Sequence, residues 1–512
     1  MRSTETWNDA YWTAVGPPPR PYPRIDREGR ADVVVVGAGI VGLTVAELLA
    51  RAGKSVVVLE ALRVGTQATA LSTAKVTSQH GLIYGRLIRD FGEHNARLYA
   101  QANQDAIDYI AGLVDRTAME CAFERKAAYV YTQSPEDTPA IEDEAMAVSM
   151  LGLPAQLVDV LPAPLAVTRA LRFDGQAQFH PVQYLAGLAA AAEKAGAAVH
   201  EDSRVTSVKA DGNRLRVSVE NGPDVDAGDV LVATHLPVVP EGKFYAKAFT
   251  FSHTAAAAPI DPAMAPDGMF ISAGQPTRSF RVDASGGSPC LVAIGPTYKT
   301  GVLEEETHSF EALERFMRDT FSIETLSHRW TNEDFKSMDG MPFVGRASSS
   351  TPRLYVATGF DAWGITNGTA AARLLSDLVL GAENPLAALF DASRMKPLAG
   401  GTEFVKENLL SAKHFVADRL SARTAEGADP QELAPGHAAV LRQDGKDVAA
   451  YRDDAGRLHT VSAVCSHMGC LVGWNDVDRT WDCPCHGSRF GPDGGVLHGP
   501  ASSALEPLPA AD

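Results

Sequence analysis

Two short runs rich in cysteine and histidine, close to the end of the chain, restrict its possible folds more than any other feature. They are Cys465-Ser466-His467-Met468-Gly469-Cys470 and Cys483-Pro484-Cys485-His486-Gly487-Ser488. The two runs contain four of the six cysteines of the chain. Two thiolates can hold one iron and two imidazoles a second iron, which is the ligand set of a Rieske [2Fe–2S] centre.

The pattern resembles the Rieske proteins of cytochrome bc-type complexes. The resemblance implies four cluster ligands: Cys465 and Cys483 on one iron, and His467 and His486 on the other. It also implies a disulfide between Cys470 and Cys485, which would join the two cluster loops. The alternative is a structural zinc site, because two cysteines and two histidines can form a tetrahedral set. Zinc would leave Cys470 and Cys485 without a role and would not explain why Gly487-Ser488 follows the last ligand.

The composition limits the partners of the protein. With 512 residues the chain is long enough for two or three domains, and its net charge of −17 argues against nucleic acid and anionic membranes. No stretch approaches the roughly 18 consecutive apolar residues of a membrane-spanning helix. The start of the chain shows no signal-peptide pattern and no twin arginine. We therefore expect a cytoplasmic protein without a membrane span, in which Cys121 and Cys290 are buried apolar side chains.

A second motif, near the start of the chain, is typical of dinucleotide binding. A strand (31–36), the turn Gly37-Ala38-Gly39-Ile40-Val41-Gly42, a helix (43–52) and a second strand (55–59) are predicted to form a βαβ unit. Gly37 permits the tight turn, Gly39 lets the backbone approach a pyrophosphate, and Gly42 lets the helix pack on the strand. Glu60 ends the second strand and is placed to accept hydrogen bonds from ribose hydroxyls.

The motif favours FAD over NAD. No second G-x-G-x-x-G sequence occurs in the chain, whereas flavoprotein reductases that use a nicotinamide usually carry two such units. The stretch 65–81 is composed largely of small and polar residues. It could run as a loop along the pyrophosphate and the isoalloxazine.

Residues 31–390 resemble the D-amino-acid-oxidase-like family of FAD-dependent amine and amino-acid oxidoreductases. The resemblance includes the glycine turn, Glu60 and the run Lys75-Val76-Thr77-Ser78-Gln79-His80-Gly81, a form seen in the subgroup with a C-terminal Rieske domain. It implies an α/β Rossmann-type FAD-binding domain with an inserted α+β substrate domain, followed by a small all-β Rieske domain.

The same resemblance implies further contacts with FAD. The strand near Val205 would contact the adenine, and the strand-turn at 338–345 would approach the flavin. A helix N-terminus near 364–368 would direct N–H groups at the flavin N1/C2=O edge. The predicted cofactor-binding residues are Gly37, Gly39, Ile40, Gly42, Glu60, Lys75, Val205, Gly359, Gly364, Ile365 and Thr366.

We expect four regions along the chain. They are an extended proline-rich arm (1–30), the FAD-dependent oxidoreductase (31–385), a helical linker (386–430, with a helix at 404–420) and the Rieske domain (431–512). Within the oxidoreductase, the FAD-binding segments are about 31–90, 196–236 and 331–385, and the substrate domain comprises about 91–195 and 237–330.

Four residues are candidates for a catalytic role: Lys75, His80, Arg278 and Lys299. Arg278 and Arg281 flank the start of a predicted strand, and their three-residue spacing would point them to opposite faces. Only one of them could then face the flavin and grip a substrate carboxylate. Lys299 follows another predicted strand, and related enzymes place a lysine near flavin N5. The alternative for each candidate is a structural role, either on the surface or in a satisfied core position.

The chain is expected to hold both a flavin, which accepts two electrons, and a cluster, which accepts one. This combination predicts a dehydrogenase. It would oxidise the C–N bond of an amine or amino-acid-like substrate and pass electrons singly through the cluster to an external protein or quinone. The reverse direction of electron flow also fits the sequence. Two alternatives stay open: an electron-transfer or redox-sensing protein, and an O₂-using amine oxidase with a structural Rieske module.

One residue of the second cluster loop bears on the reduction potential. In respiratory-type Rieske loops Gly-Ser-x-Tyr follows the last ligand, and the Ser and Tyr hydroxyls bond to cluster sulfurs; here Ser488 is present but Phe490 takes the Tyr position. Hydrogen bonds to these sulfurs stabilise the reduced, more negative state. We therefore predict a potential below that of high-potential respiratory centres, within about −150 to +300 mV.

Overall fold

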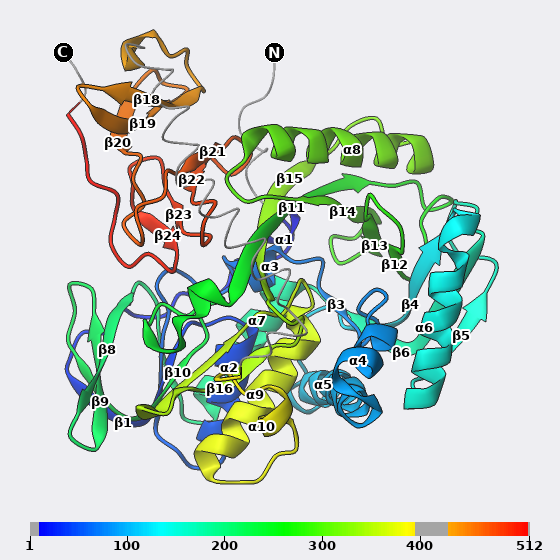
Figure 1. The fold of residues 1–512 in the computed structure, drawn as a ribbon, viewed down its shortest axis with the longest axis horizontal. Coiled ribbons are helices and arrows are strands. Elements are labelled where there is room, and N and C mark those ends of the chain that lie inside the picture. The colour runs from blue at the N-terminus through cyan, green and yellow to red at the C-terminus, as the bar shows by residue number, and fades with distance from the viewer. Residues whose placement is uncertain (1–9, 395–428, 510–512) are drawn as a thin grey trace.

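Residues 10–394 and 429–509 are described by the structure, a computed structural model (Figure 1). Two large sheets form the body of the protein, and two small sheets form its C-terminal part. The predicted helix at 404–420 and most of the predicted linker lie outside the described residues. No helix of the described part is long and apolar enough to cross a membrane.

The first large sheet contains the dinucleotide motif. Its strands follow the order β16-β17-β10-β1-β2-β7, with β8 and β9 attached beside β10. Residues 33–36 of β1 are all valines and all buried, as expected for a central parallel strand that is covered on both faces. The strands are β1 (Gly29–Val36), β2 (Val56–Leu59), β7 (Ala198–His200), β8 (Val205–Asp211), β9 (Arg214–Val219), β10 (Val225–Val232), β16 (Phe343–Ser348) and β17 (Thr351–Thr358).

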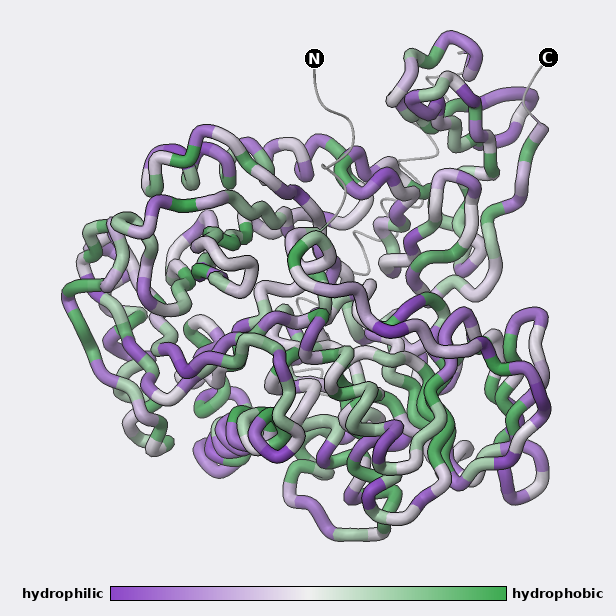
Figure 2. Tube along the Cα trace, turned by 180° about the vertical axis from the view of Figure 1, so that it is seen from behind, coloured by the Kyte–Doolittle hydropathy of each residue, from purple (hydrophilic) through white to green (hydrophobic). Residues whose placement is uncertain are grey.

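Helix α2 (Ile40–Arg51) follows β1 through the glycine turn and packs against α7 (Pro181–Lys194) and α9 (Gly364–Leu380). Gly368 of α9 allows a close approach, because an added Cβ there would lie 3.1 Å from methyl groups of Ile40 and Val41. Hydrophobic stretches, green in Figure 2, run through the body of the protein.

The second large sheet has the order β15-β11-β14-β13-β12-β4-β6-β3, with β5 beside β6, so β15 is an edge strand. Its strands are β3 (Lys75–Val76), β4 (Glu124–Thr132), β5 (Ala155–Val158), β6 (Arg169–Gln178), β11 (Ala248–Pro259), β12 (Met269–Ser272), β13 (Ser279–Asp283), β14 (Cys290–Tyr298) and β15 (His328–Ser337). Helix α8 (Leu303–Phe321) packs on β14 and β11. The remaining helices of this half are α4 (Tyr84–Phe91), α5 (Glu93–Thr117) and α6 (Thr138–Leu151).

The C-terminal part is all-β. One sheet contains β18 (Ala438–Gln443), β19 (Lys446–Arg452) and β20 (Leu458–Ser462), and the other contains β21 (Gly473–Asn475), β22 (Thr480–Asp482), β23 (Arg489–Phe490) and β24 (Val496–His498). Its core combines Trp474, Trp481 and Phe490 with the four cysteines of the two runs. The structure thus has an α/β body with an inserted α+β half and a small all-β module. This architecture confirms the predicted fold class.

The start of the described chain is anchored to the body. A short helix, α1 (Tyr11–Ala14), precedes a segment that has no regular structure up to β1. The Trp12 indole donates to the Ser72 carbonyl (2.8 Å), and the Tyr11 hydroxyl donates to Asp283 (2.9 Å). The predicted extended arm therefore holds at least one element that is buried against the core.

We predict that Gly42→Ala damages the dinucleotide motif. An added Cβ would lie 1.9 Å from the Gly37 carbonyl oxygen, and such overpacking costs typically about 1–3 kcal/mol. We expect a lower melting temperature and less bound flavin, measured by thermal unfolding and by flavin absorbance after gel filtration. Gly112→Ala in α5 is the matched control, because no atom lies within 4 Å of its added Cβ. It should stabilise the protein by roughly 0.5–1 kcal/mol. Wild-type melting and flavin content in Gly42→Ala would contradict this account.

Candidate functional site

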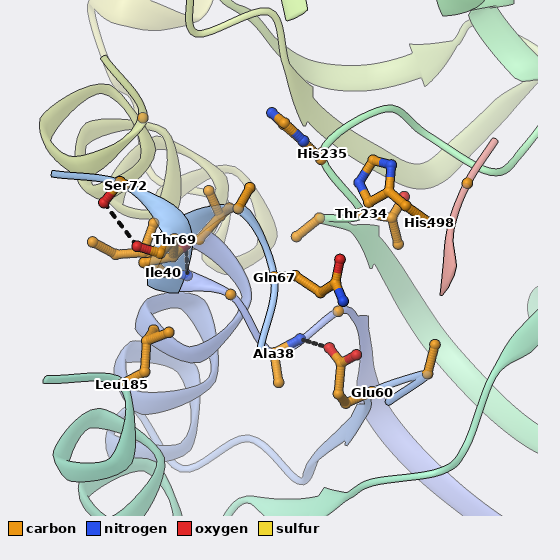
Figure 3. A pocket seen from close by; sticks show the side chains of 18 of the residues that line it. Ala38, Ile40, Glu60, Gln67, Thr69, Ser72, Leu185, Thr234, His235 and His498 are labelled. Atoms are coloured by element: carbon orange, nitrogen blue, oxygen red, sulfur yellow. Dashed lines mark hydrogen bonds between the residues drawn. The ribbon is translucent and has the colours of Figure 1, made fainter. Parts of the chain in front are cut away.

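A large cavity opens at the carboxyl ends of β1 and β10 (Figure 3). It encloses about 1470 Å³, its open mouth included. Residues from the glycine turn, the loop 65–73 and the first turn of α9 line it, together with residues of β11, β14 and β15. The C-terminal module also contributes, through Leu497, His498 and Gly499.

One end of the cavity is formed by the dinucleotide motif. Gly37 has a φ of +101°, and an added Cβ would lie 2.6 Å from the Ala233 carbonyl oxygen, so this position requires glycine. At Gly39 an added Cβ would meet only Thr69 Oγ1, at 3.5 Å, so the backbone here borders open space that a pyrophosphate can approach. The residues present therefore fit a dinucleotide at the start of α2.

Glu60 is held in place by backbone donors. Its Oε2 accepts from the Ala38 N–H (2.8 Å), drawn in Figure 3, and its Oε1 accepts from the Leu62 N–H (2.9 Å). Burial raises the pKa of this carboxyl, and the two N–H donors oppose that effect. Glu60 lines the cavity together with Val205, which agrees with a ribose and an adenine at this end.

The predicted cofactor contacts divide into two groups. Gly37, Gly39, Ile40, Glu60, Val205, Gly364 and Ile365 line the cavity, whereas Gly42, Lys75, Gly359 and Thr366 do not. Gly42 packs on the glycine turn, and the Thr366 hydroxyl donates to the Thr77 carbonyl (2.9 Å). The roles of individual residues toward FAD stay predictions.

Lys75 and His80 lie in the core beside the cavity. The Lys75 ammonium donates to the Phe270 carbonyl (2.6 Å) and to the Ser279 hydroxyl, and burial lowers its pKa well below the usual value. The His80 ring bonds to the Tyr99 hydroxyl (2.7 Å) and the Thr77 carbonyl (2.8 Å). Burial lowers the pKa of His80 to about 3, so the imidazole is neutral. Both side chains are engaged in structural contacts.

Arg278, Arg281 and Lys299 do not line the cavity. The Arg278 guanidinium stacks over Phe316 at 5.1 Å. Arg281 is fully buried and donates to three backbone carbonyls, those of Thr73, Phe179 and Val282. Lys299 lies near the cysteine and histidine runs instead, because its charge contributes, after burial and His467, to lowering the pKa of His486 to about 3.

The two runs form loops with the same backbone pattern. In the first, Cys465 N–H donates to the Cys470 carbonyl (2.8 Å) and Gly469 N–H donates to the Cys465 carbonyl (2.9 Å). In the second, Cys483 N–H donates to the Ser488 carbonyl (2.8 Å) and Gly487 N–H donates to the Cys483 carbonyl (2.9 Å). Cys470 and Cys485 form a disulfide, as predicted.

The four predicted ligands converge between these loops. Cys465 and Cys483 are free thiols and buried, and the rings of His467 and His486 lie 5.0 Å apart. Nδ1 of each histidine is buried without a hydrogen-bond partner, which is the state expected of an atom that binds metal. The Cys465 sulfur receives hydrogen bonds from Cys483, Ser488 and two backbone N–H groups, and the Cys483 contact leads in lowering its pKa to about 7. The residues fit a cluster held by two thiolates and two imidazoles.

Strand β15 borders both the cavity and this C-terminal module, because its side chains alternate between two faces. Asn332 and Asp334 line the cavity. Thr331 accepts from Asn475 (3.1 Å) and donates to Asp478 on the other side. Glu333 lies on that side as well, and its Oε2 is 3.4 Å from Nδ1 of His498, while burial raises the pKa of Glu333 to about 8.

The histidine edge of the cluster loops faces the body of the protein. Tyr245, in the short segment Glu241–Ala246, lies edge-on to both rings, with centroids 5.5 Å from His467 and 5.6 Å from His486. An added Cβ at Gly487 would lie 2.0 Å from Oε1 of Glu333, so β15 packs directly against the second loop. The two parts of the molecule thus meet at the predicted ligands.

Comparison with known proteins identifies both parts. The family model for FAD dependent oxidoreductases matches residues 32–378, and that for the Rieske [2Fe-2S] domain matches residues 426–509. The chain belongs to the FAD dependent oxidoreductase family and carries a C-terminal Rieske domain. Its cofactors are FAD and a [2Fe–2S] cluster, and the Rieske match decides against the zinc alternative.

Relatives cover the whole chain or the oxidoreductase alone. The Bacillus subtilis (strain 168) protein YhfW, named for a Rieske 2Fe-2S iron-sulfur centre, is 36% identical over 501 residues, which are 98% of this chain and 97% of that protein. Glycine oxidase from Geobacillus kaustophilus has a TM-score of 0.60 at 18% identity, covering 72% of this chain and 99% of its own. L-proline dehydrogenase from P. horikoshii has a TM-score of 0.58 at 19% identity, covering 73% and 98%. At these identities the structures show a shared fold.

Sequence reasoning did not identify five polar residues that line the cavity, nor the aromatic residue that packs against the two histidines of the cluster loops. They are His235, His253, Asn332, Asp334 and His498 on the wall, and Tyr245 on the cluster loops. Only the polar run 331–334 within a strand gave a signal, since a period of two there places alternate polar groups on opposite faces. The other residues come from segments far apart in the chain.

We predict that Phe490→Tyr raises the reduction potential of the cluster and that Ser488→Ala lowers it. Ser488 is fully buried and bonds to Cys465, and Phe490 is fully buried in the same core. A sulfur hydrogen bond that is about 1 kcal/mol stronger in the reduced state shifts a one-electron potential by roughly 40 mV. Redox titration followed by electron paramagnetic resonance measures both shifts. An unchanged or lower potential in Phe490→Tyr would refute the role given to this position.

Proposed function

We propose that the protein dehydrogenates the C–N bond of an amine or amino-acid-like substrate and passes the electrons singly, through the Rieske cluster, to an external acceptor. The observation that carries the proposal is the shared cavity wall: the dinucleotide motif and His498 of the Rieske domain line one cavity. Structural neighbours whose names include glycine oxidase and L-proline dehydrogenase support a substrate with a C–N bond. The predicted cytoplasmic location stays a prediction.

The proposed reaction is a two-electron oxidation of the substrate. A C–H bond next to nitrogen breaks, a C=N bond forms, and two electrons and two protons leave the substrate. When bound, FAD supplies a two-electron acceptor and the [2Fe–2S] cluster a one-electron carrier. For each imine that forms, either two equivalents of a one-electron carrier protein are reduced and two protons are released, or one quinone takes up both electrons and two protons and becomes a quinol.

The residues of the chain position the two sites against each other. Phe335 on β15 stacks on His498, with centroids 6.2 Å apart, and both contact the His235 ring. His235 and His498 line the cavity, so these ring contacts connect the cavity wall to the Rieske domain. Tyr245 of the oxidoreductase contacts both predicted histidine ligands, so it joins the body of the protein to the edge of the cluster site.

Anaerobic mixing with a panel of amines and amino acids, followed by admission of air, tests the proposal. We expect that a substrate bleaches the flavin and that the cluster signal of the reduced state then develops before air enters. Bleaching by no compound would favour an electron-transfer or redox-sensing protein. Rapid peroxide formation in air, with the cluster oxidised throughout, would favour an oxidase in which the Rieske module is structural.

We predict that Tyr245→Ala slows reduction of the cluster without slowing the bleaching of the flavin. The substitution removes the ring that packs on both predicted histidine ligands, and Tyr245→Phe, which keeps the ring, is the matched control. Stopped-flow absorbance separates the two phases, and iron content verifies that the cluster is retained. Equal cluster reduction in Tyr245→Ala and the wild type would show that this contact has no part in electron transfer.

A further inference from the structure

The cavity wall opposite the glycine turn carries a group of polar side chains on two adjacent strands. His253 of β11 is the cross-strand partner of Asn332 on β15, and Phe251 is the partner of Asp334. His253, Asn332 and Asp334 are 4%, 5% and 8% exposed, and all three line the cavity. Residues of α9 (Gly364 and Ile365) and of β14 (Ile294) line the same cavity.

This wall contains no permanent cation. Among the described residues that line the cavity, the only lysine or arginine side chains are Arg63 and Arg204. Both already have partners: Arg63 pairs with Glu201 (2.9 Å), and Arg204 donates to the Val496 carbonyl (2.6 Å) and acts on the charge of Glu60. Arg278, which the sequence suggested as a carboxylate ligand, lies outside the cavity.

The histidines do not replace the missing cation. Burial lowers the pKa of His253 to about 4 and that of His498 to about 3, so both rings are neutral at neutral pH. The remaining histidine of the wall, His235, already contacts Asp334, with its Nε2 3.2 Å from Oδ1 of the carboxylate.

Asp334 keeps one carboxylate oxygen available. Its Oδ1 accepts from the Phe335 N–H (2.7 Å) and contacts Nε2 of His235 (3.2 Å). No hydrogen bond within the described residues reaches Oδ2. A buried carboxylate oxygen beside a cavity is a strong acceptor for a charged N–H donor.

We propose that Asp334 binds the positively charged nitrogen of an amine that has no carboxylate next to that nitrogen, with His253 and Asn332 as neutral hydrogen-bonding groups. The inference rests on the proposed function and narrows its substrate class from amines or amino acids to amines. An amino acid would place its carboxylate on a wall that offers an aspartate and no cation, and a buried anion without a partner is strongly disfavoured.

A binding experiment with the FAD-loaded protein tests the inference without turnover. Benzyltrimethylammonium, whose quaternary nitrogen prevents dehydrogenation, and benzoate are titrated separately at about pH 7, and the flavin absorbance reports binding. We expect the cation to bind and benzoate not to bind. Asp334→Asn, which keeps the shape of the side chain, should weaken the binding of the cation at least tenfold. Asp108→Asn on α5, with a side chain that is 77% exposed, is the control and should bind as the wild type does. Benzoate binding as tight as that of the cation, or unweakened cation binding in Asp334→Asn with wild-type flavin content, would overturn the inference.

Anaerobic reduction by matched pairs separates this inference from the proposed function. The pairs are benzylamine and phenylglycine, pyrrolidine and proline, and methylamine and glycine, whose members differ only in the carboxylate. If the amines bleach the flavin and the amino acids do not, the result supports both the amine site and the dehydrogenase. Bleaching by amino acids as fast as by amines keeps the dehydrogenase and overturns the amine site. Cation binding that depends on Asp334, without bleaching by any pair, keeps the cation site and removes the dehydrogenase.

Discussion

The cavity wall and the docking of the Rieske domain both depend on the two faces of strand β15. The strand lies at the edge of the second large sheet, and the period of two along its backbone sends Asn332 and Asp334 toward the cavity. The same period sends Thr331 and Glu333 toward the Rieske domain. One strand therefore forms a wall of the flavin site and the docking surface of the cluster domain. A shift of register by one residue would exchange the two sets of side chains, so the register carries both sites.

Close packing fixes the Rieske domain on this wall. Gly487, with a φ of +74°, leaves room for the Glu333 carboxyl, and Gly473 leaves room for the backbone of Gly301. Arg489 extends an ion-pair network with Asp478 and Asp482 to the Thr331 hydroxyl. The predicted histidine ligands face the oxidoreductase through Tyr245 and are only partly exposed to solvent. A buried interface of this kind suits electron exchange within one chain.

The electrostatics of the cavity differ between its two ends. The dinucleotide end has Arg63 and Arg204 together with Glu60, whereas the opposite wall has Asp334 and neutral polar groups. Burial lowers the pKa of His253, so this ring is uncharged. On that wall the Asp334 carboxylate therefore has His235 as its side-chain partner. Lys75, a catalytic candidate from the sequence, and Arg281 both donate to backbone carbonyls.

Local chemistry made part of this protein predictable from its sequence alone. The glycine turn, Glu60 and the two cysteine and histidine runs are short motifs whose residue types and spacing dictate a dinucleotide site, a cluster and, by resemblance, the disulfide. The cavity wall and the cap on the cluster were decided only by tertiary structure. His253, Asp334, Tyr245 and His498 meet because β11, β15 and the Rieske domain pack together, and such contacts between distant segments depend on packing and register, which no local pattern specifies.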